Sequence, residues 1–168
     1  LDGGISSYAG TGSTATAAVD TMAGNLRLSL MVSAGQYAGG RLNFDSCVRA
    51  GTFNAIQFTV AVASGNLTNC PLQAQIQTQD KRPTTATNPS GGTCASNCEQ
   101  YPAPVLTPQP AGAMATTYTI LLTSFSPASS VATANQITGL QWQVNSGNNG
   151  SGTCTVELRI DSIRLVTM

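Results

Sequence analysis

Apolar and polar residues alternate with a period of two along several segments of this chain. Leucine occupies every second position of residues 26–30. Residues 140–145 read LQWQVN, so apolar side chains alternate with amides, and residues 155–161 follow the same period. Successive side chains of a strand point to opposite faces of its sheet, so each segment predicts a strand with one face on a core. This one-sided pattern is typical of antiparallel sheets with a solvated outer face.

The same signal predicts eight strands, separated by clusters of turn-forming residues. They span residues 13–20, 25–32, 40–46, 54–62, 71–78, 117–125, 138–145 and 155–166. No segment shows a strong helical period. The sequence therefore predicts an all-β fold, a two-sheet antiparallel β-sandwich of the jelly-roll type. The length of 168 residues is sufficient for one domain with a buried core.

Two further segments need separate interpretations. Residues 1–24 are either a first strand or a donor strand that pairs with the sheet edge of a neighbouring molecule. We assign residues 25–168 to the jelly-roll domain. Within it, residues 81–115 form a long loop that contains six prolines and two cysteines. A loop of this length in a compact domain is usually functional, and its prolines restrict the conformations it can adopt.

Charge is scarce and balanced in this chain. Seven basic and seven acidic residues make up 8% of the sequence, against roughly 25% in an average soluble domain. Nucleic acid is excluded as a partner because no basic field exists to hold phosphates. A membrane is excluded because there is neither a polybasic patch nor an apolar run of about 18 residues. The uncharged polar composition and the start at Leu1 predict a mature secreted protein of bacterial origin.

The cysteine count is odd, which allows at most two internal disulfides. The five are Cys47, Cys70, Cys94, Cys98 and Cys154. We favour a local Cys94–Cys98 disulfide over a metal or redox site, because the two lie four residues apart in the long loop. Cys47 and Cys70 flank a predicted strand about 26 Å long, whereas bridged Cα atoms lie within about 7 Å. If the last strand runs antiparallel beside residues 54–62, Cys154 reaches Cys70, and we predict that bridge with Cys47 unpaired.

Several segments together resemble a known family. They are GRLNFDSCVRAGTFNAIQFTVAV, NCPLQAQIQTQDKRPT, GGTCASNCEQYP, GLQWQVNS and CTVELRIDSIRL. They are similar to galactose-binding-like β-jelly-roll domains of secreted bacterial proteins, which often serve as carbohydrate-binding modules attached to glycoside hydrolases. The resemblance covers most of residues 25–168 and implies a jelly roll that binds carbohydrate. The same fold also serves in adhesive, structural and spacer domains.

Glutamines follow one face of two predicted strands. Gln73, Gln75 and Gln77 project from one strand, and Gln141 and Gln143 project from another. If the two strands are neighbours, their amides form a two-row polar patch. Each amide both donates and accepts hydrogen bonds, as sugar hydroxyls do, so the patch is a candidate floor for a polysaccharide site. The alternative is an ordinary wet surface, because outward strand positions must be polar.

Sugar sites usually add an aromatic ring on which the apolar face of a pyranose stacks. Trp142 shares its face with Leu140 and Val144, so we assign it to the core. Phe44, Phe58 and Tyr118 are assigned to the core on the same grounds. Three tyrosines, Tyr8, Tyr37 and Tyr101, lie in loops or at strand ends. We choose Tyr101, in the long loop, as the exposed platform and as part of a wall beside the amides.

A charged cluster, Asp80, Lys81 and Arg82, ends the glutamine strand. Arg82 is a candidate ligand for a sugar rim or an acidic polysaccharide, and the alternative is that Asp80 and Arg82 anchor the long loop. The family resemblance also implies a structural Ca²⁺, with Asp161 as the match in the closing strand and Asp2 as a poor match in the opening one. Pairing of Asp161 with a neighbouring arginine is the alternative.

No sequence feature marks a catalytic site. The chain has seven carboxylates and no histidine, and the nucleophile motif GxSxG is absent. A glycosidase needs two carboxylates about 5–9.5 Å apart. Glu157 and Asp161 lie on one face of the last strand but about 13 Å apart, and a partner for Asp45 stays open. We therefore predict that the protein is not an enzyme and needs no cofactor beyond the possible Ca²⁺.

Two functions from different classes fit these observations. The first is a secreted, non-catalytic carbohydrate-binding module that recognises a polysaccharide through a polar, concave sheet. The second is a structural subunit of an extracellular filament, sheath or surface layer. Low charge favours such self-association because little electrostatic repulsion opposes it.

Overall fold

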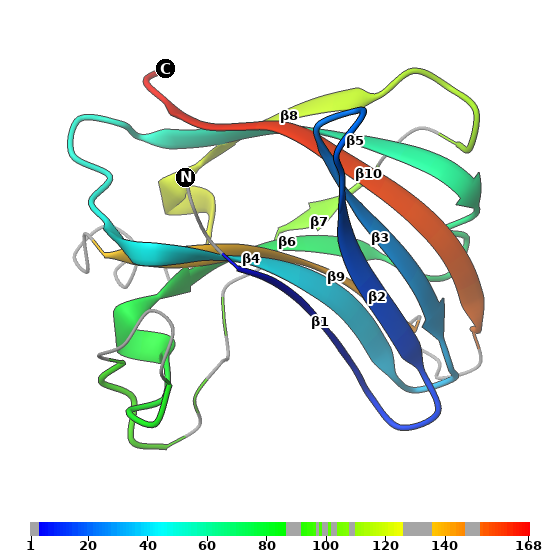
Figure 1. The fold of residues 1–168 in the computed structure, drawn as a ribbon, viewed down its shortest axis with the longest axis horizontal. Helices are drawn as coiled ribbons and strands as arrows, with labels where there is room; N and C mark the ends of the chain where they lie inside the picture. The colour runs from blue at the N-terminus through cyan, green and yellow to red at the C-terminus, as the bar shows by residue number, and fades with distance from the viewer. Residues whose placement is uncertain are drawn as a thin grey trace.

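Two antiparallel β-sheets lie face to face in a computed structural model of the chain (Figure 1). The structure describes residues 4–86, 92–96, 98, 101, 104–107, 110–125, 136–146 and 152–168. Among these residues each sheet has five strands, in the order β1-β4-β9-β6-β7 in sheet A and β2-β3-β10-β5-β8 in sheet B. The described part of the chain contains no apolar helix long enough to span a bilayer.

The strands of sheet A are β1 (Ile5–Ala9), β4 (Tyr37–Val48), β9 (Ile137–Asn145), β6 (Leu72–Thr78) and β7 (Val105–Leu106). Those of sheet B are β2 (Thr14–Asp20), β3 (Asn25–Val32), β10 (Cys154–Val166), β5 (Ala55–Gly65) and β8 (Thr116–Leu121). Two short 3-10 helices, η1 (Gln79–Lys81) and η2 (Leu122–Ser124), follow β6 and β8. All eight predicted strands are present, which confirms the all-β prediction. The strand predicted over 117–125 ends at Leu121, because the chain turns there into η2.

The N-terminal segment contributes a strand to each sheet. β1 pairs antiparallel with β4, from Ile5 opposite Leu42 to Ala9 opposite Ala38. β2 pairs with β3, and the short turn between β1 and β2 carries the chain from one sheet to the other. Both strands therefore pair within the chain itself, as the first-strand alternative predicts. The described residues of the segment include no unpaired strand, and the division at residue 24 stays a prediction.

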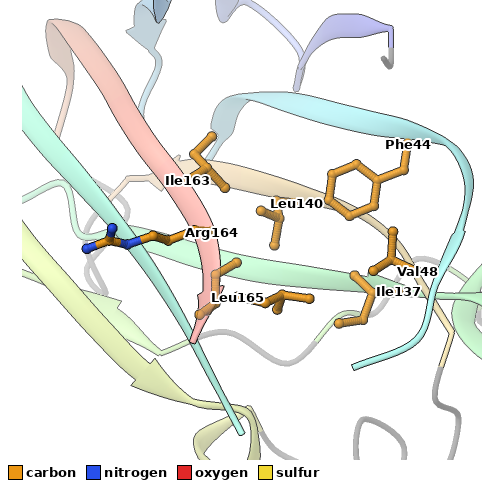
Figure 2. A pocket seen from close by; sticks show the side chains of 8 residues that line it. Phe44, Val48, Ile137, Leu140, Ile163, Arg164 and Leu165 are labelled. Atoms are coloured by element: carbon orange, nitrogen blue, oxygen red, sulfur yellow. The ribbon is translucent and has the colours of Figure 1, made fainter. Parts of the chain in front are cut away.

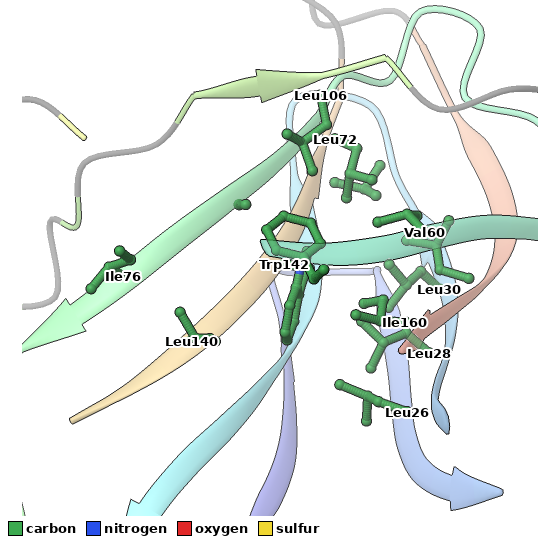
Figure 3. Close-up of a cluster of buried hydrophobic side chains, with 14 of the residues drawn as sticks. Leu26, Leu28, Leu30, Val60, Leu72, Ile76, Leu106, Leu140, Trp142 and Ile160 are labelled. Atoms are coloured by element: carbon green, nitrogen blue, oxygen red, sulfur yellow. The ribbon is translucent and has the colours of Figure 1, made fainter. Parts of the chain in front are cut away.

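The core fills the space between the two sheets (Figure 3). The ring of Trp142 on β9 meets that of Phe58 on β5 edge to face, with centroids 5.5 Å apart. Leucines of β3 and aliphatic residues of β6 complete the layer, and Leu28, Leu72 and Ile76 are fully buried. The assignment of Trp142, Phe44 and Phe58 to the core is confirmed. Burial of each large side chain stabilises the fold by about 1.5–3 kcal/mol.

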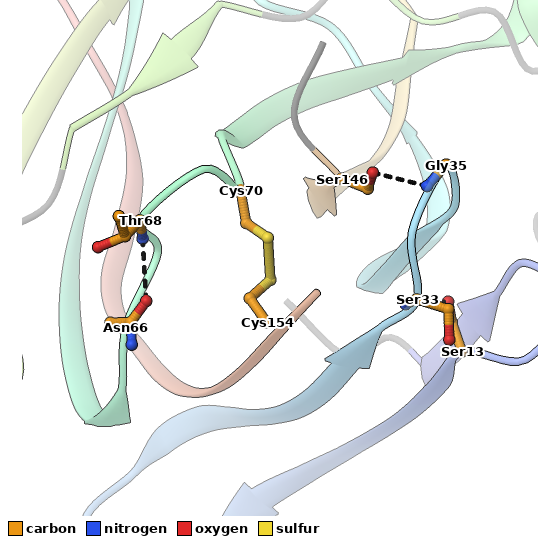
Figure 4. The surroundings of a disulfide bond; sticks show 8 residues. All are labelled: Ser13, Ser33, Gly35, Asn66, Thr68, Cys70, Ser146 and Cys154. Carbon is orange, nitrogen blue, oxygen red and sulfur yellow. Dashed lines mark hydrogen bonds between the residues drawn. A yellow bond between two sulfur atoms is a disulfide. The ribbon is translucent and has the colours of Figure 1, made fainter. Parts of the chain in front are cut away.

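Both predicted disulfides are present. β10 runs antiparallel beside β5, and this brings Cys154, its first residue, to Cys70 in the turn before β6 (Figure 4). Their Cα atoms are 6.4 Å apart, and those of Cys94 and Cys98 are 5.7 Å apart. Cys47 is unpaired and half-buried near the end of β4. The long bridge therefore joins the middle of sheet B to sheet A.

Ionisation of the Tyr118 hydroxyl on β8 makes the stability of the fold depend on pH in the alkaline range. Its ring packs against Phe58 with centroids 5.8 Å apart, and burial raises the pKa of its hydroxyl above the ordinary value of about 10. Because the folded state favours the neutral hydroxyl, Tyr118 contributes to the free energy of unfolding. This contribution is complete below about pH 10 and is lost as the pH rises through the folded-state pKa. We expect the unfolding free energy to fall more in wild type than in Tyr118→Phe between about pH 8 and about pH 11. Urea titrations at both pH values measure this, and an equal fall would contradict it.

Candidate functional site

The predicted amide rows lie side by side on the outer face of sheet A. β6 and β9 pair antiparallel, with Gln73 directly opposite Gln143 and Gln75 directly opposite Gln141. β9 also pairs with β4, which places Arg41 opposite Gln141 on the same face. The hypothesis that the two glutamine strands are neighbours is therefore confirmed. The five glutamines nevertheless divide into a closed and an open set.

Three of them form a closed amide cluster, which we define as Gln75, Gln77 and Gln141. Each is at most 7% exposed. Gln77 Nε2 donates to Gln141 Oε1 at 2.7 Å, and Gln141 Nε2 donates to Gln75 Oε1. The side chain of Gln77 lies over Gly139, its paired residue on β9, where a Cβ would come within 2.6 Å of Gln77 Oε1. Two side-chain hydrogen bonds join these buried amides to one another, so the prediction that they line an open groove is corrected.

The long loop begins and ends beside these amides. It leaves sheet A at Gln79 and returns at Pro104, whose carbonyl accepts from the backbone N–H of Ala74 on β6 at 3.3 Å. Figure 1 shows η1, in green, below sheet A at the lower left. Arg82 within it is held by backbone bonds, from its own N–H to Gln79 and from Cys94 to its carbonyl. The loop therefore leaves sheet A beside the closed cluster and returns at β7, whose Val105 pairs with Gln73.

Two predicted ligand residues in this loop are buried. Tyr101 and Arg82 are each 8% exposed. The expectation that Tyr101 is an exposed stacking platform is therefore wrong, because its side chain is buried. Burial of Arg82 likewise favours the loop-anchoring alternative over contact with a sugar rim.

The open amide row consists of Gln73, Gln143 and Asn145, which are half-buried. Gln143 Nε2 donates to Asn145 Oδ1 at 2.7 Å, and Asn145 Nδ2 donates to Gln73 Oε1 at 3.0 Å. This chain of bonds ends in an acceptor, Gln143 Oε1, and in a donor, Gln73 Nε2. Neither end has a side-chain partner in the described part of the chain. A hydroxyl, which both donates and accepts, is complementary to such a row.

An exposed ring stands beside the open row. Tyr37 on β4 is directly paired with Asn145 and is 44% exposed. Tyr8 on β1 is half-buried, and its ring centroid is 6.2 Å from that of Tyr37. The sequence places Tyr37 among the tyrosines of loops and strand ends, whereas in the structure it is the first residue of β4. The sequence contains a signal for Tyr37, because Tyr37 and Arg41 fall on alternate positions of β4, opposite to those of Leu42 and Phe44, which pack on the core.

The predicted calcium ligands do not come together in the described residues. Asp161 is exposed on β10 and accepts from the backbone N–H of Ser162, and Asp2 lies outside the described residues. Neither neighbouring arginine pairs with Asp161, because Arg159 lies 3.7 Å from Glu157 and Arg164 donates to Gln57. The described part of the chain contains no group of three or more His, Cys, Asp or Glu that could hold a metal. Calcium binding stays a prediction.

An apolar pocket opens between the sheets at the end of the sandwich (Figure 2). Its lining consists of Phe44, Val48, Ile56, Ile137, Leu140, Ile163, Arg164 and Leu165. Figure 2 shows the guanidinium of Arg164 directed away from the apolar side chains. Ligand sites for polar molecules need convergent polar groups, so this pocket is not a sugar site.

Comparison with known proteins bears on the fold. The sequence matches no family model, and no curated protein resembles it in sequence. A family 11 carbohydrate-binding module from Clostridium thermocellum, in complex with a β-1,3-1,4-mixed-linked tetrasaccharide, has a TM-score of 0.65 at 13% identity, covering 97% of this chain and 88% of that chain. The family 11 module of a cellulosomal cellulase from the same organism has a TM-score of 0.66 at 14% identity, covering 100% and 89%.

A β-1,2-glucanase from Parabacteroides distasonis also contains this sandwich. The match has a TM-score of 0.57 at 12% identity and covers 97% of this chain but 23% of that chain. The same architecture therefore occurs both as a separate module and as a small part of a large chain. Together these likenesses confirm that the chain folds as a β-sandwich jelly roll of the kind found in carbohydrate-binding modules.

Proposed function

We propose that this chain is a secreted, non-catalytic carbohydrate-binding domain that holds a polysaccharide on the outer face of sheet A. The observation that carries the proposal is the open amide row, Gln73, Gln143 and Asn145, beside the exposed ring of Tyr37. The row supplies a donor and an acceptor to sugar hydroxyls, and the ring supplies an apolar surface for a pyranose. The carbohydrate-binding modules with the same fold support this reading.

The arrangement favours binding over catalysis. The directly paired outer-face residues of β1, β4, β9 and β6 from Tyr37 to Asn43 include no carboxylate. Glycoside hydrolysis needs two carboxylates close to the scissile bond. A shallow row with few ligand bonds, many of them shared with water, gives modest affinity. The ligand is thus held and released unchanged.

Secretion is supported by the two disulfides. Bridges such as Cys70–Cys154 persist in oxidising compartments and are rare in the cytosol. The modules with the same fold come from a bacterium, which supports a bacterial origin. The filament alternative loses its proposed donor strand, because β1 and β2 pair within the chain. The experiment for the proposal is affinity electrophoresis against a panel of polysaccharides, beginning with mixed-linked β-glucan. Absence of retardation by every polysaccharide would refute it.

Replacing Tyr37 by alanine is expected to weaken polysaccharide binding about tenfold. The change removes the ring beside the open row while its neighbours on β4 remain in register, and loss of a stacked ring costs roughly 0.5–1.5 kcal/mol beyond its buried area. Affinity electrophoresis or calorimetry measures the ratio of dissociation constants. Phe53→Ala is the matched control, because Phe53 is 43% exposed but lies in the turn between β4 and β5. Equal weakening by both variants would remove Tyr37 from the site.

A further inference from the structure

Strand β8 is an edge of sheet B, and among the described residues it has a neighbouring strand on one side alone. It pairs with β5 over its whole length, from Ala55 opposite Leu121 to Val60 opposite Thr116, without a register shift. The other edge of the same sheet, β2, lies against β1 of sheet A. An edge strand presents backbone N–H and C=O groups with which another strand can pair. In the described part of the chain, β8 is therefore the edge at which sheet B can be extended.

The sequence of β8 lacks the features that usually protect an edge. Natural edge strands carry charged residues, prolines or β-bulges, or they are very short. β8 has six residues, and residues 111–125 contain neither a charge nor a proline. The strand consists of threonine, tyrosine, isoleucine and leucine, most of which favour strands, and Leu121 at its end is 41% exposed. This composition favours pairing with a second strand.

The side chains of β8 are complementary to those of a second copy of the strand. Residues directly opposite each other in an antiparallel pair share a face, so a twofold axis passes between one residue and its own copy. With the axis at Thr119, Tyr118 lies opposite the second copy of Ile120, and Thr117 lies opposite that of Leu121. Each larger side chain then faces a smaller one, which suits close packing. The two copies of Thr119 form a threonine pair, which stabilises strand pairing.

Charge does not oppose this arrangement. In the paired rows of β8 the charged residues are Arg164, opposite Gln57, and Asp161, opposite Thr59, and both lie on β10. β5 separates β10 from β8, so the two copies of Arg164 would be five strand spacings apart, or about 24 Å. This distance exceeds the Debye length of about 8 Å at physiological ionic strength. Two copies therefore approach at this edge without electrostatic repulsion.

We propose that the chain forms a homodimer by antiparallel pairing of β8 with β8 of a second copy, centred on Thr119. The pairing joins the two copies of sheet B into one continuous sheet. A twofold axis perpendicular to that sheet leaves both copies of sheet A on the same side of it, because sheet A packs on one face of sheet B. The inference goes beyond the proposed function and has a consequence for it. Two open amide rows on one side bind one long polysaccharide with an avidity of about 10²–10⁴ over a single row.

Sedimentation velocity in the absence of polysaccharide tests the dimer. A single pair of strands buries less area than a standard interface, so we expect a dissociation constant of about 10–100 μM. Thr119→Lys should weaken the association about tenfold or more, because like charges directly opposite each other in a strand pair repel. Thr16→Lys is the matched control, since Thr16 is an exposed residue of β2, at the other edge of the same sheet. It should leave the association unchanged, and thermal unfolding establishes that each variant is folded.

Cysteine cross-linking tests the register of the pair. In a Cys47→Ala background, Thr119→Cys should form an intermolecular disulfide on oxidation, because directly opposite Cα atoms lie about 4.5–5.5 Å apart. Thr117→Cys is the control on the same face of the same strand. The two copies of residue 117 would be four residues apart along the pair, or about 13 Å, which is too far for a disulfide. This variant should run as a single chain on a denaturing gel.

Three outcomes would overturn the dimer. They are a protein that stays monomeric up to about 1 mM, an association that Thr16→Lys weakens as much as Thr119→Lys does, and equal cross-linking at residues 117 and 119. Sedimentation and cross-linking need no polysaccharide, so they judge the dimer independently of the proposed function. If no polysaccharide retards a protein that does dimerise, the proposed function fails and the dimer stands.

Discussion

Replacing Cys70 and Cys154 together by alanine is expected to lower the free energy of unfolding by about 4–5 kcal/mol. The bridge closes a loop between residues 84 apart in sequence, and in the loop-entropy model a closure of this length restricts the unfolded chain by that amount. The bridge also joins the start of β10, in the middle of sheet B, to the turn that enters β6 in sheet A. Since small domains are stable by about 5–15 kcal/mol, much of the margin depends on this bond.

Urea unfolding of the oxidised wild type and the double variant measures the effect. The double variant Cys94→Ala with Cys98→Ala is the control, because its bridge spans four residues within the long loop. The same model gives that closure about 2 kcal/mol, and its loss should leave β6 and β9 paired. A larger loss from the short bridge than from the long one would contradict the assignment.

The second large effect is expected at Trp142. Trp142→Ala should destabilise the fold by about 3–5 kcal/mol, because it leaves a cavity where the two sheets meet. The side chain is 1% exposed, and it contacts Phe58 on the opposite sheet edge to face. Its removal also deprives β9 of the residue that fixes its inner face between Gln141 and Gln143. Polysaccharide binding should therefore weaken together with stability.

Trp142→Phe distinguishes loss of packing from loss of polarity. The indole Nε1 is buried and has no hydrogen-bond partner among the described residues, so a phenyl ring leaves no protein group unpaired. We expect a cost of about 1–2 kcal/mol, well below that of alanine. Chemical denaturation of the three proteins under one condition provides the comparison. A phenylalanine variant as unstable as the alanine variant would show that the indole nitrogen makes an essential bond.

The alternation of apolar and polar side chains predicted the sheets well, because each strand shows which of its faces is inward in its own short sequence. In residues 140–145 it places Leu140, Trp142 and Val144 inward, and all three are buried. The strands that were missed lack this signal. β7 has two residues, and β1 has exposed or half-buried residues throughout. Both are strands because distant backbone groups of β6 and β4 pair with them, and a short sequence carries no record of such partners.

The candidate site was predicted in part. Parity identified the glutamine face, and the pairing of β6 with β9 followed the hypothesis. The alternation shows which side chains share a face of a sheet, but not whether other parts of the chain cover that face. The burial of Gln77 and Tyr101 was therefore not predicted. Gln77 is bonded to Gln141, 64 residues away along the chain, and a local pattern carries no information about such a partner. Tyr37 lies three residues before the strand predicted over 40–46, whereas β4 begins at Tyr37 itself.

The position of β10 has a consequence for how the chain reaches its fold. It is the last strand along the chain and yet lies between β3 and β5 in sheet B. During synthesis the pairs β2–β3 and β5–β8 emerge well before the strand that joins them. Most contacts are also distant in sequence, which is typical of slow folding. The β2–β3 pair therefore cannot be joined to the β5–β8 pair before β10 has been synthesised. Sheet B is completed only after translation of residue 160 or beyond.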